Sequence, residues 1–197
     1  MKRIAFTIGM AGAVLSAGCA RNEPPPIVVP PVEEPVVDPN SPLAAPMYMQ
    51  MAASGDLFEI QSSQLALQMS QNAAVRQLAQ TLITDHTQLS NTMMAAARSA
   101  GLTPPPPALL PQHHQMLDQL RTSGANFDAA YKTLQIAAHQ DALTLHQNYA
   151  SGGDNAALRT VAGQAVPVIQ GHLSHAQMLS LTPPPVYEAP EDPGERG

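Results

Sequence analysis

Ionisable side chains occupy positions where the sequence otherwise predicts the buried faces of helices. His86 lies in a run whose hydrophobic residues recur every three or four positions, and His172 lies in another. His139 and Glu59 border the apolar faces of two further stretches. Removing an ionisable group from water is unfavourable unless a partner or a metal ion compensates it. We therefore expect these four side chains to have partners inside the protein.

The first hypothesis for these side chains is a metal site, because each comes from a different long stretch. Helical bundles assemble metal sites in this way, from side chains on facing helices. Neutral imidazoles with one carboxylate favour Zn²⁺, Fe²⁺ or Cu²⁺ over Mg²⁺ or Ca²⁺. On this hypothesis one transition-metal ion is bound by Glu59, His86, His139 and His172.

A hydrogen-bonded polar layer explains the same residues without an ion. In that arrangement Asp85, Asp128 or Tyr131 would orient the imidazoles and hold the helices in register. Di-iron chemistry is disfavoured, because the sequence has no Glu-x-x-His step. It also has neither a Gly-x-Ser-x-Gly turn nor a second cysteine, so we expect no enzyme. The metal site and the polar layer both stay open.

The elements that must position these residues are four long helices and one short one. We expect the first helix from about Ser41, as N-cap with Pro42 after it, to about residue 70. The second begins after Asn72 and ends near Gly101. A short helix follows Pro111; the third long helix spans about 125–150, and the last follows a turn at 151–154 with Asp154 as N-cap. The long connection over about 101–124 predicts an all-α, ferritin-like four-helix bundle with one additional short helix in that connection.

The amino-terminal residues predict export and a lipid anchor. A basic pair, Lys2 and Arg3, precedes an apolar run too short to span a bilayer, which is typical of a signal peptide over residues 1–18. The segment 15–19, Leu-Ser-Ala-Gly-Cys, resembles the lipobox of bacterial lipoproteins, which implies cleavage before Cys19 and its acylation. Ala20 after it indicates the outer membrane, with the domain facing the periplasm. Acylated Cys19 then makes the membrane a partner.

Composition separates a folded centre from its flanks. Nine prolines lie within residues 20–46, so we expect a lipidated, proline-rich tether at 19–41, the bundle at 42–181 and a disordered tail at 182–197. Without residues 1–18, which hold two of the nine basic residues, the chain has 7 basic and 15 acidic residues, a formal charge of −8. This balance excludes nucleic acid as a partner, because its binding depends on Lys and Arg.

Several short elements resemble a bacterial family of unknown function, the domain of unknown function numbered four-one-four-two. They are Ala52-Ala53-Ser54-Gly55 followed by Glu59, Asp85-His86-Thr87, Phe127-Asp128-x-x-Tyr131, Ala138-His139, and Pro167 followed by His172-Leu173. The resemblance covers about residues 47–181 and implies a ferritin-like, exported helical domain with no established activity. It also implies a shared polar pattern at Glu59, Asp85, His86, Asp128, Tyr131, His139 and His172.

Together these observations predict a non-enzymatic envelope lipoprotein, in which a helical domain stands on a proline-rich tether. The first alternative is a protein that binds, stores or senses a transition metal through the Glu/His cluster. The second is an oxidoreductase of ferritin-like descent.

Overall fold

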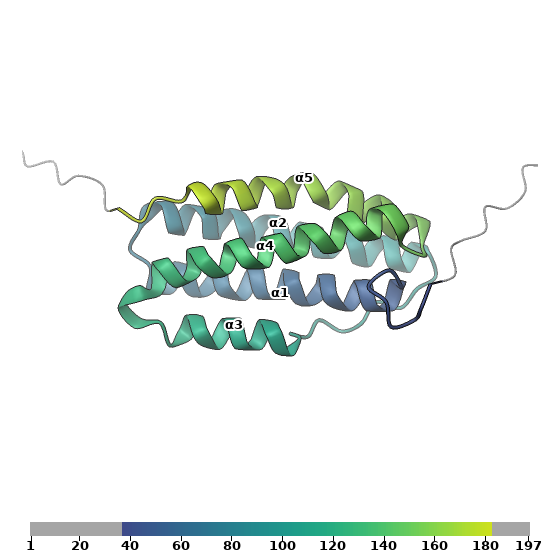
Figure 1. Cartoon of the computed structure of the whole chain (residues 1–197), viewed down its shortest axis with the longest axis horizontal. Helices are drawn as coiled ribbons and strands as arrows, with labels where there is room; N and C mark the ends of the chain where they lie inside the picture. Colours follow the sequence, from purple (N-terminus) through teal and green to yellow (C-terminus); the bar gives the residue numbers. More distant parts are fainter. Residues whose placement is uncertain (1–36, 183–197) are drawn as a thin grey trace, which may run out of the picture. The chain divides into compact units, whose positions relative to one another are not determined.

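The computed structural model describes residues 37–182, which are mostly helical and contain no strand (Figure 1). The helices are α1 (Ala45–Met69), α2 (Ala73–Ser99), α3 (Pro111–Arg121), the 3-10 helix η1 (Gly124–Asn126), α4 (Phe127–Gly152) and α5 (Ala156–Met178). The predicted all-α fold is confirmed. The predicted signal peptide, Cys19, most of the tether and nearly all of the tail lie outside the described residues. None of the described helices has the length and apolar character needed to cross a membrane.

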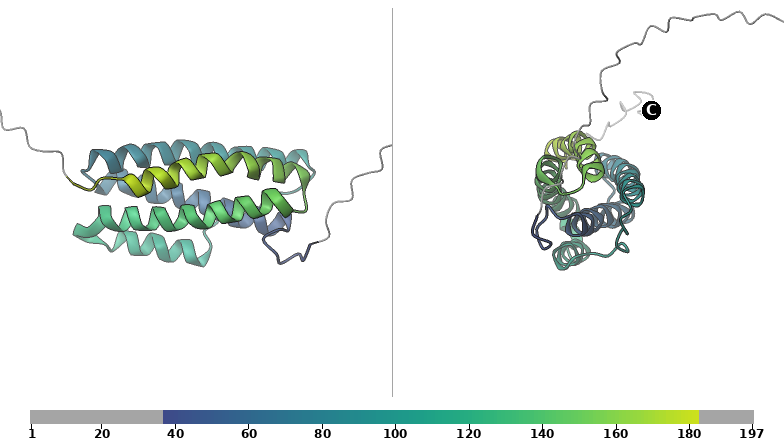
Figure 2. Two further views of the ribbon diagram at one scale, coloured as in Figure 1. Left: turned by 45° about the horizontal axis from the view of Figure 1, so that its top comes forward. Right: turned by 90° about the vertical axis from the view of Figure 1, so that its right-hand side faces the viewer.

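The four long helices form the bundle predicted from the long connection. α1 packs against α2 and α4 against α5, while α2 also contacts α5 and α1 contacts α4. After α2, the connection and α3 carry the chain back along the bundle, so that α2 and α4 run in the same direction (Figures 1 and 2). α3 lies outside the four and packs on α1 and α4. The bundle therefore has the single long crossover that was predicted from the sequence.

Local signals place some helix ends correctly and others wrongly. Asn72 caps α2, because its side chain accepts hydrogen bonds from the backbone N–H groups of Ala74 and Val75. Gly101 follows the end of α2 with φ +73°, a conformation that favours glycine. The predicted start at Ser41 and Pro42 is wrong, because those residues form a turn and α1 begins at Ala45.

Asp154 is not the cap of the last helix, contrary to the prediction. Asn155 caps α5 by accepting from the Leu158 N–H at 3.1 Å. Asp154 instead accepts from the Ala45 N–H at 2.8 Å and the Tyr149 hydroxyl at 2.9 Å. It therefore joins the start of α1 to the turn between α4 and α5.

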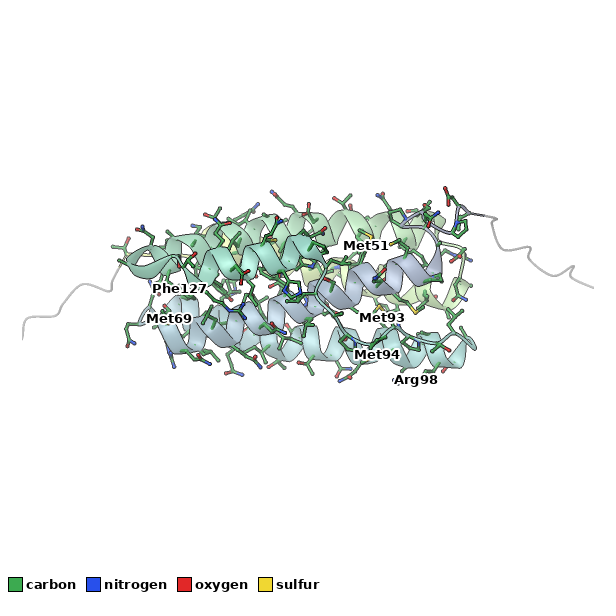
Figure 3. The ribbon with its side chains drawn as sticks, turned by 90° about the horizontal axis from the view of Figure 1, so that it is seen from below. Met51, Met69, Met93, Met94, Arg98 and Phe127 are labelled. Atoms are coloured by element: carbon green, nitrogen blue, oxygen red, sulfur yellow. The ribbon has the colours of Figure 1, made fainter. Side chains whose placement is uncertain are left out.

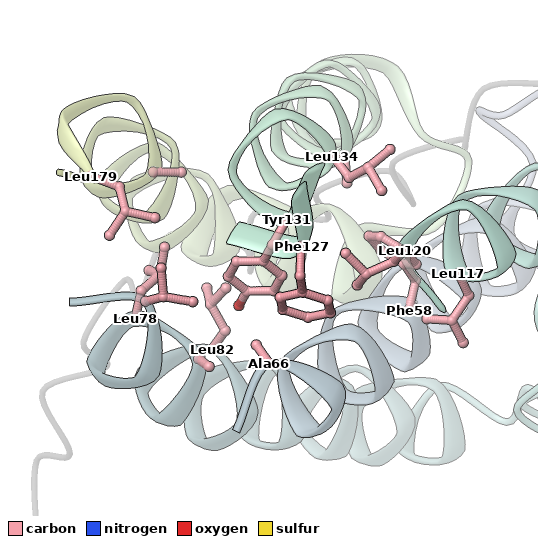
Figure 4. Packing of buried hydrophobic residues seen from close by; sticks show 14 residues of the cluster. Phe58, Ala66, Leu78, Leu82, Leu117, Leu120, Phe127, Tyr131, Leu134 and Leu179 are labelled. Carbon is pink, nitrogen blue, oxygen red and sulfur yellow. The ribbon is translucent and has the colours of Figure 1, made fainter. Parts of the chain in front are cut away.

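Two apolar clusters fill the interior and leave a polar section between them. The Phe58 cluster (Figure 4) consists of Phe58, Ala66, Val75, Leu78, Ala79, Leu82, Leu117, Leu120, Phe127, Tyr131, Leu134, Ala138, Ala176 and Leu179. The Tyr48 cluster consists of Ala45, Tyr48, Met49, Ala52, Ala53, Met93, Ala97, Tyr149, Leu158, Val161 and Ala162. On α2 the first cluster ends at Leu82 and the second begins at Met93, so His86 falls between them.

The Phe58 cluster should carry much of the stability. Leu82 is fully buried in it, so Leu82→Ala should lower the free energy of unfolding by about 2–5 kcal/mol through lost burial and a new cavity. Met178, which is 77% exposed, is the control, and Met178→Ala should change the value by less than about 0.5 kcal/mol. Urea unfolding followed by circular dichroism measures both. Equal effects of the two substitutions would contradict this packing.

Candidate metal centre

Three histidines from three helices meet in the polar section. His86 of α2, His139 of α4 and His172 of α5 are all buried, and their ring centroids are 5.3–5.4 Å apart. One ring nitrogen of each lies within 4.8 Å of one from each of the others. Among residues 37–182, this is the only group of three or more His, Cys, Asp or Glu side chains with such geometry.

Helical spacing explains why these rings point inward. His86 follows the buried Leu78 and Leu82 by two turns and one turn of α2. His139 lies two turns after the buried Tyr131 on α4. His172 lies three residues after the buried Ile169 on α5. Each histidine therefore continues the buried face of its own helix.

Each ring is oriented by a hydrogen bond at one nitrogen. The His139 Nδ1–H donates to the backbone carbonyl of Gln135 at 2.8 Å. His86 Nδ1 lies 2.9 Å from the Asp56 carboxylate, and His172 Nε2 lies 2.9 Å from that of Asp85. A carbonyl only accepts, so Gln135 places the proton of His139 on Nδ1. A carboxyl group does the same to its bonded nitrogen when it is ionised, and burial raises the pKa of Asp56 to about 7. The other nitrogen then keeps its lone pair.

The second nitrogen of each ring is buried without a hydrogen-bond partner. These atoms are His86 Nε2, His139 Nε2 and His172 Nδ1. Most buried polar atoms in proteins have a partner, so three such nitrogens in one place require an explanation. A ring held at one nitrogen and free at the other is the usual state of a metal-binding histidine. The arrangement is chemically suited to coordinate one cation.

Burial also keeps two of the rings, those of His86 and His139, uncharged at neutral pH. It lowers the pKa of His86 to about 3, with His172 contributing in the same direction. It likewise lowers the pKa of His139 to about 3, with His86 as a second cause. Metal binding therefore need not compete with protonation of these two rings near pH 7.

Glu59, a predicted ligand, lies beside the group of nitrogens but outside it. Its Oε1 is 3.5 Å from His139 Nδ1, the nitrogen that is bonded to Gln135, and its Oε2 is buried without a partner. Burial raises the pKa of Glu59 well above its ordinary value, and the Gln135 side chain offsets part of this effect. The structure thus brings together three of the four predicted ligands and leaves Glu59 as a buried acid behind one of them.

Of the three predicted supporting residues, only Asp85 contacts an imidazole of the group. The Tyr131 hydroxyl is hydrogen-bonded to Ser63 Oγ at 2.8 Å, and Asp128 Oδ1 is buried without a partner in the first turn of α4. The sequence interpretation missed Asp56, which orients His86. Its signal was present, because Asp56 falls between Ala52 and Glu59 at helical spacing on the buried face of α1.

Two further histidines, His113 and His146, are buried nearby. His113 Nδ1 is 2.6 Å from Ser54 Oγ, and its ring stacks on Phe58. His146 Nδ1 is 3.0 Å from the Tyr48 hydroxyl. His114, next to His113 on α3, is exposed. The packing of α3 on α1 accounts for the burial of His113.

Comparisons with known proteins agree with the fold. A search of curated proteins finds no match. The structure of CopM in its Cu(II)-bound form superimposes with a TM-score of 0.59 at 19% identity, covering 68% of this chain and 93% of CopM. CopM in a silver-bound form, obtained by co-crystallisation, gives 0.57 with the same identity and coverage. At this identity the likeness establishes a shared fold.

The family comparison confirms the resemblance seen in the sequence. The family described as Domain of unknown function (DUF4142) matches residues 34–179, which include all the helices described above. The chain belongs to this family.

Proposed function

We propose that this chain binds a transition-metal ion, with copper as the favoured ion, through His86, His139 and His172. The observation that carries the proposal is the set of three buried ring nitrogens without partners on rings that lie 5.3–5.4 Å apart. Each ring is held at its other nitrogen by an acceptor, as in metal sites whose outer partners orient the ligands.

The hydrogen-bonding pattern favours an ion over a purely structural polar layer. A structural layer stabilises a bundle when its buried donors and acceptors satisfy one another. Within residues 37–182, the three rings contact one another without a hydrogen bond between them, and each keeps an unpartnered nitrogen. Buried nitrogens without a partner destabilise the protein unless they bind an ion or another ligand.

The donor set and the fold support copper as the ion. Imidazole suits copper, zinc, iron and nickel, and the group contains neither thiolate nor carboxylate. CopM, which shares the fold, has been observed with Cu(II) and with silver, an ion that also accepts nitrogen ligands. Copper is therefore the first ion to test, and zinc is the comparison.

Glu59 supplies charge compensation in this proposal. Burial disfavours its carboxylate, so the protonated form is favoured when the site holds no ion. A cation on His139 makes the ring more positive and favours loss of the proton from Glu59, 3.5 Å away. The ion would then sit in a buried site whose net charge is reduced.

We infer further that the domain is held on the outer membrane by acylated Cys19 and faces the periplasm. The support is the order of the amino-terminal residues, from Lys2 and Arg3 through the apolar run to the lipobox-like segment. The proline-rich stretch that follows suits a spacer between the lipid and the bundle.

Removing one imidazole should abolish tight binding. The untagged full-length chain should take up about one equivalent of copper and gain thermal stability from it. His139→Ala should weaken binding by more than about 100-fold, beyond the 10–100-fold that outer partners usually contribute. Competition against a chromophoric chelator measures the affinity, with His114→Ala as the matched control. Wild type that binds neither copper nor zinc would falsify the proposal.

Glu59 should make the metal-free protein less stable as the pH rises. Its carboxyl group ionises near pH 4.5 in the unfolded chain but at a much higher pH when folded. Folding then takes up a proton in this window, so its contribution to stability declines as the pH increases. Glu59→Gln should therefore raise the melting temperature at pH 8, by an amount that shrinks towards pH 4. Asp118→Asn, at an exposed acid on α3, is the control. If the difference in melting temperature between Glu59→Gln and wild type did not vary with pH, burial of a protonated Glu59 would be contradicted.

Loss of the acylated cysteine should release the protein from the membrane. Cys19→Ala should move the chain from the membrane fraction to the soluble periplasmic fraction or block its processing, because no lipid can then be attached. Fractionation followed by immunoblotting measures the distribution. Unchanged membrane association of the variant would contradict the lipid anchor.

A further inference from the structure

A cavity connects the surroundings of the histidine group with the surface. Its volume is about 50 Å³, enough for water or a small ion, and Glu59, His86 and Asp56 line it. The exposed Gln112 and Asp141 line the same cavity. Since residues of both kinds line one cavity, it reaches from the polar section of the bundle to solvent between α1, α3 and α4.

His113 and His146 line the same cavity. Both are more than nine-tenths buried, at 7% and 8% exposed. Each is held at Nδ1 by a hydroxyl group, from Ser54 and Tyr48 respectively, while neither Nε2 makes a hydrogen bond to another described residue. Each ring therefore has a fixed position and a second nitrogen without a protein partner.

The hydroxyl partners distinguish these rings from the three in the group. A carbonyl or an ionised carboxylate only accepts and so fixes the proton on one ring nitrogen, whereas a hydroxyl can always donate or accept. His113 and His146 can therefore exist in either neutral form, with the lone pair on Nε2 in only one of them. Such a ring binds a metal ion less tightly than one whose lone pair is always present. Weak binding suits a transient ligand, which must release the ion.

Charge and sulfur at the cavity also favour a cation. Burial lowers the pKa of His113, and Asp141 opposes this effect. Burial lowers the pKa of His146 to about 4, and Asp56 opposes it. Both rings are thus neutral near pH 7 with a carboxyl group close by. Met51, whose thioether is a soft ligand, also lines the cavity and lies on α1 near the beginning of α3 (Figure 3).

We propose that this cavity is the route by which the metal ion reaches the buried site, with His113 and His146 as transient ligands on the way. The proposal rests on the proposed function. It does not make the cavity a second storage site, because among residues 37–182 only His86, His139 and His172 form a preassembled group. The competing route is on the other side of the site, where the Asp85 side chain behind His172 is 40% exposed.

Stopped-flow mixing of the untagged full-length chain with copper tests the route, because a transient ligand affects rates and not the final equilibrium. His113→Gln and His146→Gln should each slow uptake by at least about tenfold while the affinity stays within about threefold. The rate of release should then fall by the same factor as the rate of uptake. His114→Gln, one residue along α3 and exposed, is the matched control and should behave as wild type.

A second variant narrows the cavity without removing any histidine. A side chain at Gly55 would start 4.0 Å from the His113 ring, so Gly55→Leu has room to extend into the cavity. It should slow both uptake and release. Gly171→Leu is the control, since Gly171 is an exposed helical glycine with open space around it.

The outcomes separate the two proposals. If wild type binds no metal, the proposed function fails and the route fails with it. If wild type binds but all three cavity variants keep wild-type rates, the ion does not pass through this cavity. Slowing of both uptake and release by Asp85→Asn alone, with the affinity unchanged, would assign entry to the opposite side, because damage to the orientation of His172 would lower the affinity as well. A fall in affinity that matches the fall in rate would make His113 or His146 a permanent ligand and overturn the transient role.

Discussion

An imidazole nitrogen that is buried without a partner is unfavourable, and the centre of this bundle contains three of them. The cost is limited at His86 and His139 because these two rings are neutral, since burial lowers the pKa of each to about 3. It is also limited because the other nitrogen of each ring is satisfied by Gln135, Asp56 or Asp85. The rest of the structure holds these three rings in the interior of the bundle, away from water.

The two apolar clusters provide that support from either end. They bury large side chains such as Tyr131 and Tyr149 on both sides of the polar section, so the central residues need not contribute to stability themselves. Asp154 adds a further constraint by bonding the first turn of α1 to the turn between α4 and α5. α1 in turn carries Asp56, so the orientation of His86 depends on how this helix is seated.

The buried histidines differ in the kind of hydrogen-bond partner that orients each ring. The inner three rings are held by a backbone carbonyl or by carboxyl groups, which only accept when ionised, whereas His113 and His146 have hydroxyl partners that can always donate or accept. The first arrangement favours a permanent ligand and the second a temporary one. A single bundle can in this way combine a tight site with a path to it, provided that α3 covers the side where the path runs.

The sequence by itself determined the helices, their approximate ends at Asn72 and Gly101, and the inward direction of His86, His139 and His172. These features are local, because capping and the 3.6-residue repeat depend only on neighbours along the chain. Only the tertiary structure decided which inward residues meet. It left Glu59 outside the group, brought Asp56 to His86, buried His113 between α3 and α1 and took Asp154 away from the cap of α5. The physical reason is that a helical repeat fixes a side chain relative to its own helix axis, whereas the rotation and sliding of one helix against another depend on the packing of the whole core.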